Sequence, residues 1–76
     1  MKEFIEYAVK AIVDHPEEVA VTQIDGEKTV IFELRCNPGD IGKVIGKSGR
    51  TIKSIRTLID SAAARANLRA TLEIIE

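Results

Sequence analysis

Residues 41–52 have the sequence IGKVIGKSGRTI, in which Gly46 and Gly49 flank two polar residues. Glycine lacks a Cβ atom, so it adopts positive φ easily and lets a ligand approach the backbone closely. A helix is expected to begin after Gly49, and its unpaired N–H groups and positive dipole end would face this turn. The pattern therefore predicts a local site for an anion such as a phosphate. Lys47 and Arg50 add positive charge beside it.

Patterns on both sides of this turn predict an α+β domain. Apolar residues recur at helical spacing in some segments and alternate with polar residues in others. In chain order, we expect a helix over 2–14, strands over 18–25 and 29–36, helices over 41–45 and 50–66, and a strand over 69–75. Asp25-Gly26 predicts a hairpin between the first two strands, and the crossover before the third strand is long enough for parallel pairing. The expected fold is a three-stranded mixed sheet with three helices on one face.

Single residues refine these boundaries. Pro16 should end the first helix, because the residue before a proline is pushed out of the helical conformation. Asp40 is expected to cap the short helix that follows it, and Asn67 is expected to end the long helix in a left-handed conformation. Spacing by three and four residues predicts the inward face of that long helix, which should consist of Ile52, Ile55, Ile59, Ala62 and Ala66.

Length and charge limit the possible functions. The chain has 76 residues, enough for one small domain over residues 1–76. Its net charge is −1, but residues 1–38 hold four basic and eight acidic residues, whereas residues 43–69 hold seven basic residues and one acidic residue. This asymmetry favours a basic, anion-facing surface, although lysines and arginines that merely solvate a helix would give the same count. The absence of a signal peptide, a membrane span and a second cysteine favours a cytoplasmic protein.

The stretch Ile45-Gly46-Lys47-Ser48-Gly49-Arg50-Thr51-Ile52 resembles the signature of K-homology (KH) domains. In that signature an I-G-x-x-G core joins two helices and clamps about four nucleotides by their backbone. The expected α-β-β-α-α-β order is similar to the type II KH fold of bacteria, and the whole chain resembles the KhpA family of single-domain KH proteins. The resemblance implies a cytoplasmic RNA chaperone that acts with a second KH protein, KhpB, and influences cell shape and cell wall biogenesis or degradation.

The resemblance also implies which residues bind single-stranded RNA. The candidates are Gly46, Lys47, Ser48, Gly49 and Arg50 at the turn, Lys43 and Lys53 nearby, and Ile41, Val44, Ile45 and Ile52 in an aliphatic groove, some of which must also serve the core. The aromatic residues lie elsewhere in the sequence, so stacking of bases on rings should not dominate. We expect weak, salt-sensitive binding with little sequence discrimination, because one small module neutralises few phosphates.

Other functions receive less support from the sequence. The segment from Gly42 to Ser48 differs from a P-loop, because only three residues separate Gly42 from Gly46 and a helix is expected before Gly46. Cys36 is expected to be a small core residue, and His15 is expected to be structural. No nucleophile–base pair, metal-ligand cluster or cofactor motif is evident, so we expect neither an enzyme nor a bound cofactor.

A rival hypothesis is an interaction module that dimerises or holds a partner KH protein. The small core and the alanine-rich helix over 50–66 motivate this alternative, because small side chains let another helix approach closely. Under this hypothesis, replacing Ile59 or Ala63 with glutamate should give a folded monomer. The two hypotheses are compatible, because pairing two weak RNA-binding modules raises their avidity.

Overall fold

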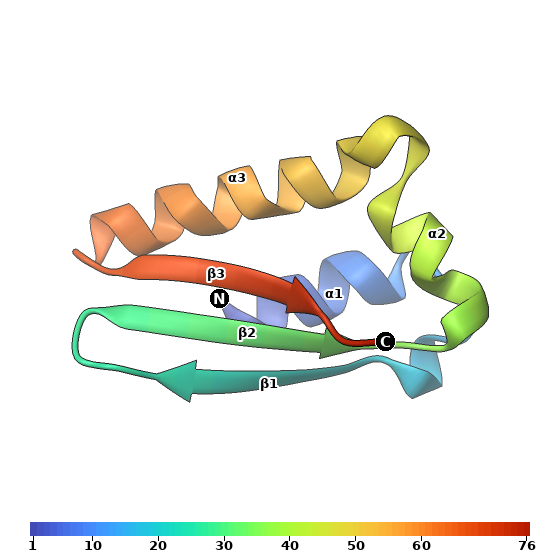
Figure 1. Cartoon of the computed structure of the whole chain (residues 1–76), viewed down its shortest axis with the longest axis horizontal. Helices are drawn as coiled ribbons and strands as arrows, with labels where there is room; N and C mark the ends of the chain where they lie inside the picture. Colours follow the sequence, from blue (N-terminus) through green and yellow to red (C-terminus); the bar gives the residue numbers. More distant parts are fainter.

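The three strands form one mixed sheet in the order β1-β2-β3 in a computed structural model that describes all residues 1–76 (Figure 1). β1 spans Ala20–Asp25, β2 spans Thr29–Arg35 and β3 spans Arg69–Ile74. β1 pairs antiparallel with β2, and β2 pairs in parallel with β3. Both predicted pairings are therefore confirmed, and β1 and β3 are left as the edge strands.

Three helices accompany the sheet, and the predicted element order is confirmed. They are α1 (Lys2–Lys10), α2 (Ile41–Ile45) and α3 (Arg50–Arg65). Single turns of 3-10 helix occur at η1 (Pro16–Glu18) and η2 (Pro38–Asp40), whereas η3 (Lys47–Gly49) is a tight turn with non-helical backbone at Ser48. Figure 1 shows α1 behind the sheet, α3 running along β3, and α2 beyond the ends of β2 and β3.

The core lies between the helices and one face of the sheet. Its largest fully buried side chain is Phe32 of β2. The twelve side chains of the core are Ile5, Val9, Val19, Val21, Val30, Phe32, Leu34, Val44, Ile52, Ile55, Ile59 and Leu72. Successive strand residues point to opposite faces, and the alternate residues Thr22, Ile24 and Thr71 are exposed. The other face of the sheet is therefore uncovered, as expected.

Two boundaries differ from the sequence-based expectation. α1 ends at Lys10 rather than at residue 14. The chain leaves the helix early, and the backbone N–H groups of Asp14 and His15 instead bind the carboxylate of Asp40. β1 begins at Ala20 rather than at residue 18, because Pro16–Glu18 form a 3-10 turn, whose φ suits proline.

The inward face of α3 was predicted correctly in its first three turns and incorrectly in its last. Ile52, Ile55 and Ile59 are buried, but the fourth buried residue is Ala63. Ala62 and Ala66 are exposed. The left-handed end of this helix is confirmed, because Asn67 has φ 61°. None of the helices combines the length and the apolar character that a bilayer-crossing segment needs.

Candidate nucleic-acid interface

The turn between α2 and α3, residues Gly46–Gly49, is called the glycine turn below. α2 ends where the N–H of Gly46 donates to the carbonyl of Gly42 at 2.9 Å. Gly46, Ser48 and Gly49 then all have positive φ, at 78°, 57° and 73°. A hydrogen bond from the N–H of Gly49 to the carbonyl of Gly46, 3.1 Å long, closes the turn before α3 begins. The backbone is thus held in a conformation that only glycine, and occasionally a small polar residue, adopts readily.

The two glycines are required for different reasons. A Cβ atom on Gly46 would collide with the Thr51 hydroxyl and lie 2.7 Å from the Cβ of Thr51, in the first turn of α3. A Cβ atom on Gly49 would meet nothing within 4 Å. Gly46 therefore lets α2 and α3 approach each other, whereas Gly49 is needed only for its φ and borders open space that a ligand could occupy.

The basic residues predicted to surround the glycine turn point in several directions. Lys47 and Arg50 are exposed, and neither forms a salt bridge. Arg50 lines a hollow between α3 and α1, and Lys53 lies on a separate stretch of the α3 surface. Lys43 is engaged, because its Nζ lies 3.2 Å from Oδ2 of Asp14. Lys47 is consequently the unpaired cation within the turn itself.

The four predicted groove residues divide between core and surface. Val44 and Ile52 are 0 % and 6 % exposed and belong to the core cluster. Ile41 is half-buried, and Ile45 is 38 % exposed. Of the four, Ile45 offers the most apolar surface to a base, followed by Ile41.

The other end of α2 is fixed by the carboxylate of Asp40, which is only 1 % exposed. This side chain was predicted to cap α2, but it makes no capping hydrogen bond. Instead, it accepts hydrogen bonds from the N–H of Asp14 at 3.3 Å and from the N–H of His15 at 3.0 Å. Nδ1 of His15 lies 3.1 Å from the same carboxylate. The connection after α1 is thereby tied to the start of α2.

These contacts change the acidity of the groups involved. Burial raises the pKa of Asp40, but the two backbone N–H donors and His15 outweigh it, so the pKa lies below its ordinary value of 3.8. The hydrogen bond to Asp40 raises the pKa of His15 above 6.5, although burial opposes this effect. Burial also raises the pKa of Cys36, and its half-buried side chain packs against the core. The thiol is therefore poorly suited to be a nucleophile.

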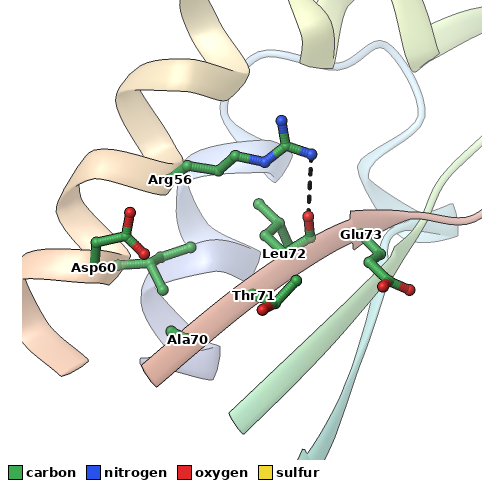
Figure 2. A pocket seen from close by; sticks show the side chains of 7 residues that line it. Arg56, Asp60, Ala70, Thr71, Leu72 and Glu73 are labelled. Atoms are coloured by element: carbon green, nitrogen blue, oxygen red, sulfur yellow. Dashed lines mark hydrogen bonds between the residues drawn. The ribbon is translucent and has the colours of Figure 1, made fainter. Parts of the chain in front are cut away.

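A groove that sequence reasoning missed lies between α3 and the free edge of β3 (Figure 2). It has a volume of about 320 Å³, and Ile59, Ala70 and Leu72 provide its apolar surface. Arg56 reaches across it from α3, and its Nη2 donates to the carbonyl of Leu72 at 3.1 Å. Arg56 belongs to the basic stretch already noted, but no sequence pattern indicates that its partner is a sheet-edge carbonyl 16 residues away.

The structure contains no cluster of three or more histidine, cysteine or carboxylate side chains placed to hold a metal ion. Its hollows are shallow surface features, and their lining residues include no paired nucleophile and base. The geometry thus offers an exposed backbone turn with nearby cations, which suit an extended polyanion, and a groove whose lining is partly apolar and partly charged.

Comparison with known proteins agrees with this geometry. The family described as "KhpA/KhpB, KH domain" matches residues 2–74. A protein named RNA-binding protein KhpA from Chlamydia muridarum is 57% identical over 76 residues, covering 100% of this chain and 97% of that protein. Proteins of the same name from Clostridium perfringens and Aquifex aeolicus are 48% and 43% identical over 75 and 76 residues, covering 99% and 100% of this chain and 100% and 96% of theirs. No solved structure matches significantly. The chain therefore belongs to the KhpA/KhpB KH-domain family.

Proposed function

We propose that this protein binds single-stranded RNA, with the backbone of the glycine turn against the sugar-phosphate chain. The observation that carries the proposal is the turn itself, which combines three positive φ values with open space beside Gly49. Lys47 would neutralise a phosphate there, and Ile45 and Ile41 would contact a base. The relatives' name, RNA-binding protein KhpA, supports the same function. The family is not a class of enzymes, and we assign no catalytic residue.

The test is a fluorescence titration of short single-stranded RNA with the Lys47→Asp/Ser48→Asp variant. Both residues are exposed, and aspartate tolerates the left-handed conformation of Ser48. We expect a folded protein that has lost at least about tenfold in affinity, because two negative charges would face the phosphates. Unchanged affinity in the folded variant would refute the site. Gly46→Asp is less suitable, because its collision with Thr51 would disturb α3 as well.

An accessory interaction function is favoured by a separate observation. One hollow between α1 and α3 is lined only by apolar residues, namely Met1, Phe4, Leu58, Ile59 and Ala62. Leu58 is 56 % exposed, and Tyr7 on α1 is 78 % exposed. Such a surface suits a second copy of the chain or a KhpB-like partner, a pairing that the family description KhpA/KhpB supports.

The burial of Ile59 and Ala63 means that other substitutions are needed to test this accessory function. Ile59 and Ala63 are 2 % and 1 % exposed, so replacing either with glutamate would disrupt the core rather than give the folded monomer first expected. Leu58→Glu is the appropriate substitution, because its side chain is largely outside the core. If the surface mediates self-association, light scattering should show a smaller particle that is still folded by circular dichroism, with a Tm lowered by the loss of pairing. An unchanged particle size would exclude this surface as a contact between two copies of the chain.

We propose a cytoplasmic RNA-chaperone role, with downstream effects on cell shape and the cell wall, which the resemblance to the KhpA family implies. The family description supports the KH-domain, RNA-binding part of this role. Crosslinking the protein in cells and sequencing the bound RNA would test it, and a chaperone should be recovered on many unrelated transcripts. Recovery on no RNA above background would contradict the role.

A further inference from the structure

The geometry points to a second RNA-backbone contact at the far end of α3 from the glycine turn, formed by Lys28 and Arg69. This inference rests on the proposed RNA-binding function and extends it. It assigns phosphate binding to a hollow between the β1–β2 connection, the end of α3 and the start of β3. The residues that line this hollow are Lys28, Thr29, Ala64, Asn67, Leu68 and Arg69.

The backbone holds the two cations side by side. The N–H of Arg69 donates to the carbonyl of Lys28 at 2.8 Å, and the next residue, Thr29, is the partner of Arg69 in the parallel pairing of β2 and β3. Both cationic side chains are exposed. Because their main chains are fixed, only the two side chains would have to order around an anion placed between them.

The charge of this hollow differs from that of the others. Lys28 and Arg69 form no salt bridge, and no carboxylate lines the hollow. Glu27 precedes Lys28 in the sequence but is not among the lining residues. The groove of Figure 2, by contrast, contains Asp60 and Glu73 beside its single arginine, Arg56. Among the hollows, only this one combines two cations with no acidic residue.

The end of α3 is closed by backbone hydrogen bonds. The carbonyls in the last turn of a helix carry partial negative charge that repels anions. Here the carbonyl of Ala63 accepts from the N–H of Leu68 at 2.8 Å, and the carbonyl of Ala64 accepts from the N–H of Asn67 at 3.0 Å. These bonds satisfy two of the last carbonyls of α3 and so reduce the partial negative charge that faces the hollow.

The position of the hollow indicates a long ligand. Figure 1 shows the β1–β2 connection and the end of α3 at the opposite end of the molecule from the turn between α2 and α3. α3 has 16 residues, which span about 24 Å at 1.5 Å per residue. Arg56 lies between the two ends, above the edge of β3. A single RNA strand that follows α3 from the glycine turn would pass the groove of Figure 2, where Arg56 offsets part of the charge of Asp60 and Glu73, before it reaches the two distal cations.

The experiment compares RNA lengths. Labelled RNAs of about four nucleotides, the length that a KH loop clamps, and of about twelve nucleotides are titrated at several salt concentrations with wild type and Lys28→Gln/Arg69→Gln. We expect the variant to bind the longer RNA about three- to tenfold more weakly. Its salt slope should be lower by about 1.4, since each phosphate contact contributes about 0.7 for single strands. Affinity for the short RNA should not change.

Lys2→Gln/Lys10→Gln is the matched control, because it removes the same charge from α1, where both lysines pair with Glu6. Equal weakening by this control, equal loss of the short RNA, or unchanged binding of the longer RNA would each overturn the inference. Loss of self-association with intact RNA affinity would overturn it by assigning the hollow to a protein contact. If wild type binds neither RNA, the proposed function fails as well, so the two failures are distinguishable.

Discussion

The two ends of α2 are held in opposite ways. At its start, the carboxylate of Asp40 is shielded from solvent and accepts two backbone hydrogen bonds besides its contact with His15. At its end, the glycine turn is shaped by backbone conformation, and the side chains of Lys47 and Ser48 are exposed. One end is fixed by tertiary contacts to a distant segment, and the other presents itself to solvent.

The difference between the two ends of α2 explains how the glycine turn is ordered. A helix of five residues is not stable by itself, because nucleation costs more than one turn of hydrogen bonds returns. The contacts at Asp40 fix the start of α2 to the rest of the fold, and Val44 anchors its middle in the core. The glycine turn can then be ordered without using its own side chains, which stay free for a ligand. Order before binding reduces the entropy that binding must overcome.

The largest expected effect comes from Asp40→Ala. It removes the carboxylate that binds the N–H groups of Asp14 and His15 and the ring of His15, and each hydrogen bond to a charged group contributes about 1.5–3 kcal/mol. We expect Tm to fall by at least about 15 °C, and RNA affinity should fall in the fraction that remains folded. Asp40→Asn keeps one carbonyl acceptor and should recover part of both. Equal RNA affinity in folded Asp40→Ala and wild type would show that this end of α2 does not position the glycine turn.

A smaller effect is expected from Gly46→Ala, and it should exceed that of Gly49→Ala. Both substitutions place a Cβ atom at positive φ. Gly49 is in the left-handed region, where this costs about 1–2 kcal/mol, whereas Gly46, at φ 78° and ψ 173°, is in a region populated essentially by glycine alone, where it costs about 1–3 kcal/mol. Gly46→Ala adds the collision with Thr51, for a total of about 2–4 kcal/mol. Urea unfolding measures both free energies. Equal losses would mean that contact between α2 and α3 does not restrict residue 46.

The same comparison explains what could be predicted from the sequence. Positive φ selects glycine, so the glycine turn could be predicted from the sequence. The alternation of apolar and polar residues likewise predicted β2 and its inward residues. The role of Asp40 was not visible, because a carboxylate before a helix looks the same whether it caps that helix or binds a loop 25 residues away. Ala62 and Ala63 are chemically identical, so only the packed structure could identify the buried one.

Asp14→Asn should have a modest effect on binding. Lys43 Nζ lies 3.2 Å from Asp14 Oδ2, and both side chains are largely exposed, so the pair adds little stability. Removing the carboxylate charge would free Lys43 for a phosphate while keeping the backbone bond from residue 14 to Asp40. We expect RNA affinity to rise about two- to threefold and the salt slope to steepen by about 0.7. Glu3→Gln, which removes the same charge from α1, should leave the slope unchanged, and a wild-type slope in Asp14→Asn would contradict a role for Lys43.

The smallest effect is a dependence of stability on pH through His15. Its folded pKa lies above 6.5, so its contribution is complete below that pH and is lost as pH rises through the folded value. The pKa of Asp40 lies below 3.8, so its contribution is present above that pH and is lost on further acidification. The groups that face the pair of His15 and Asp40 are Glu17, Glu18 and Cys36, and the two glutamates also favour protonated His15.

Tm should therefore fall slightly between pH 6 and pH 8, and His15→Gln, which can still donate to Asp40 but does not titrate, should remove that fall. A wild-type profile in His15→Gln would show that another group is responsible, and that the charge of His15 does not stabilise the buried end of α2.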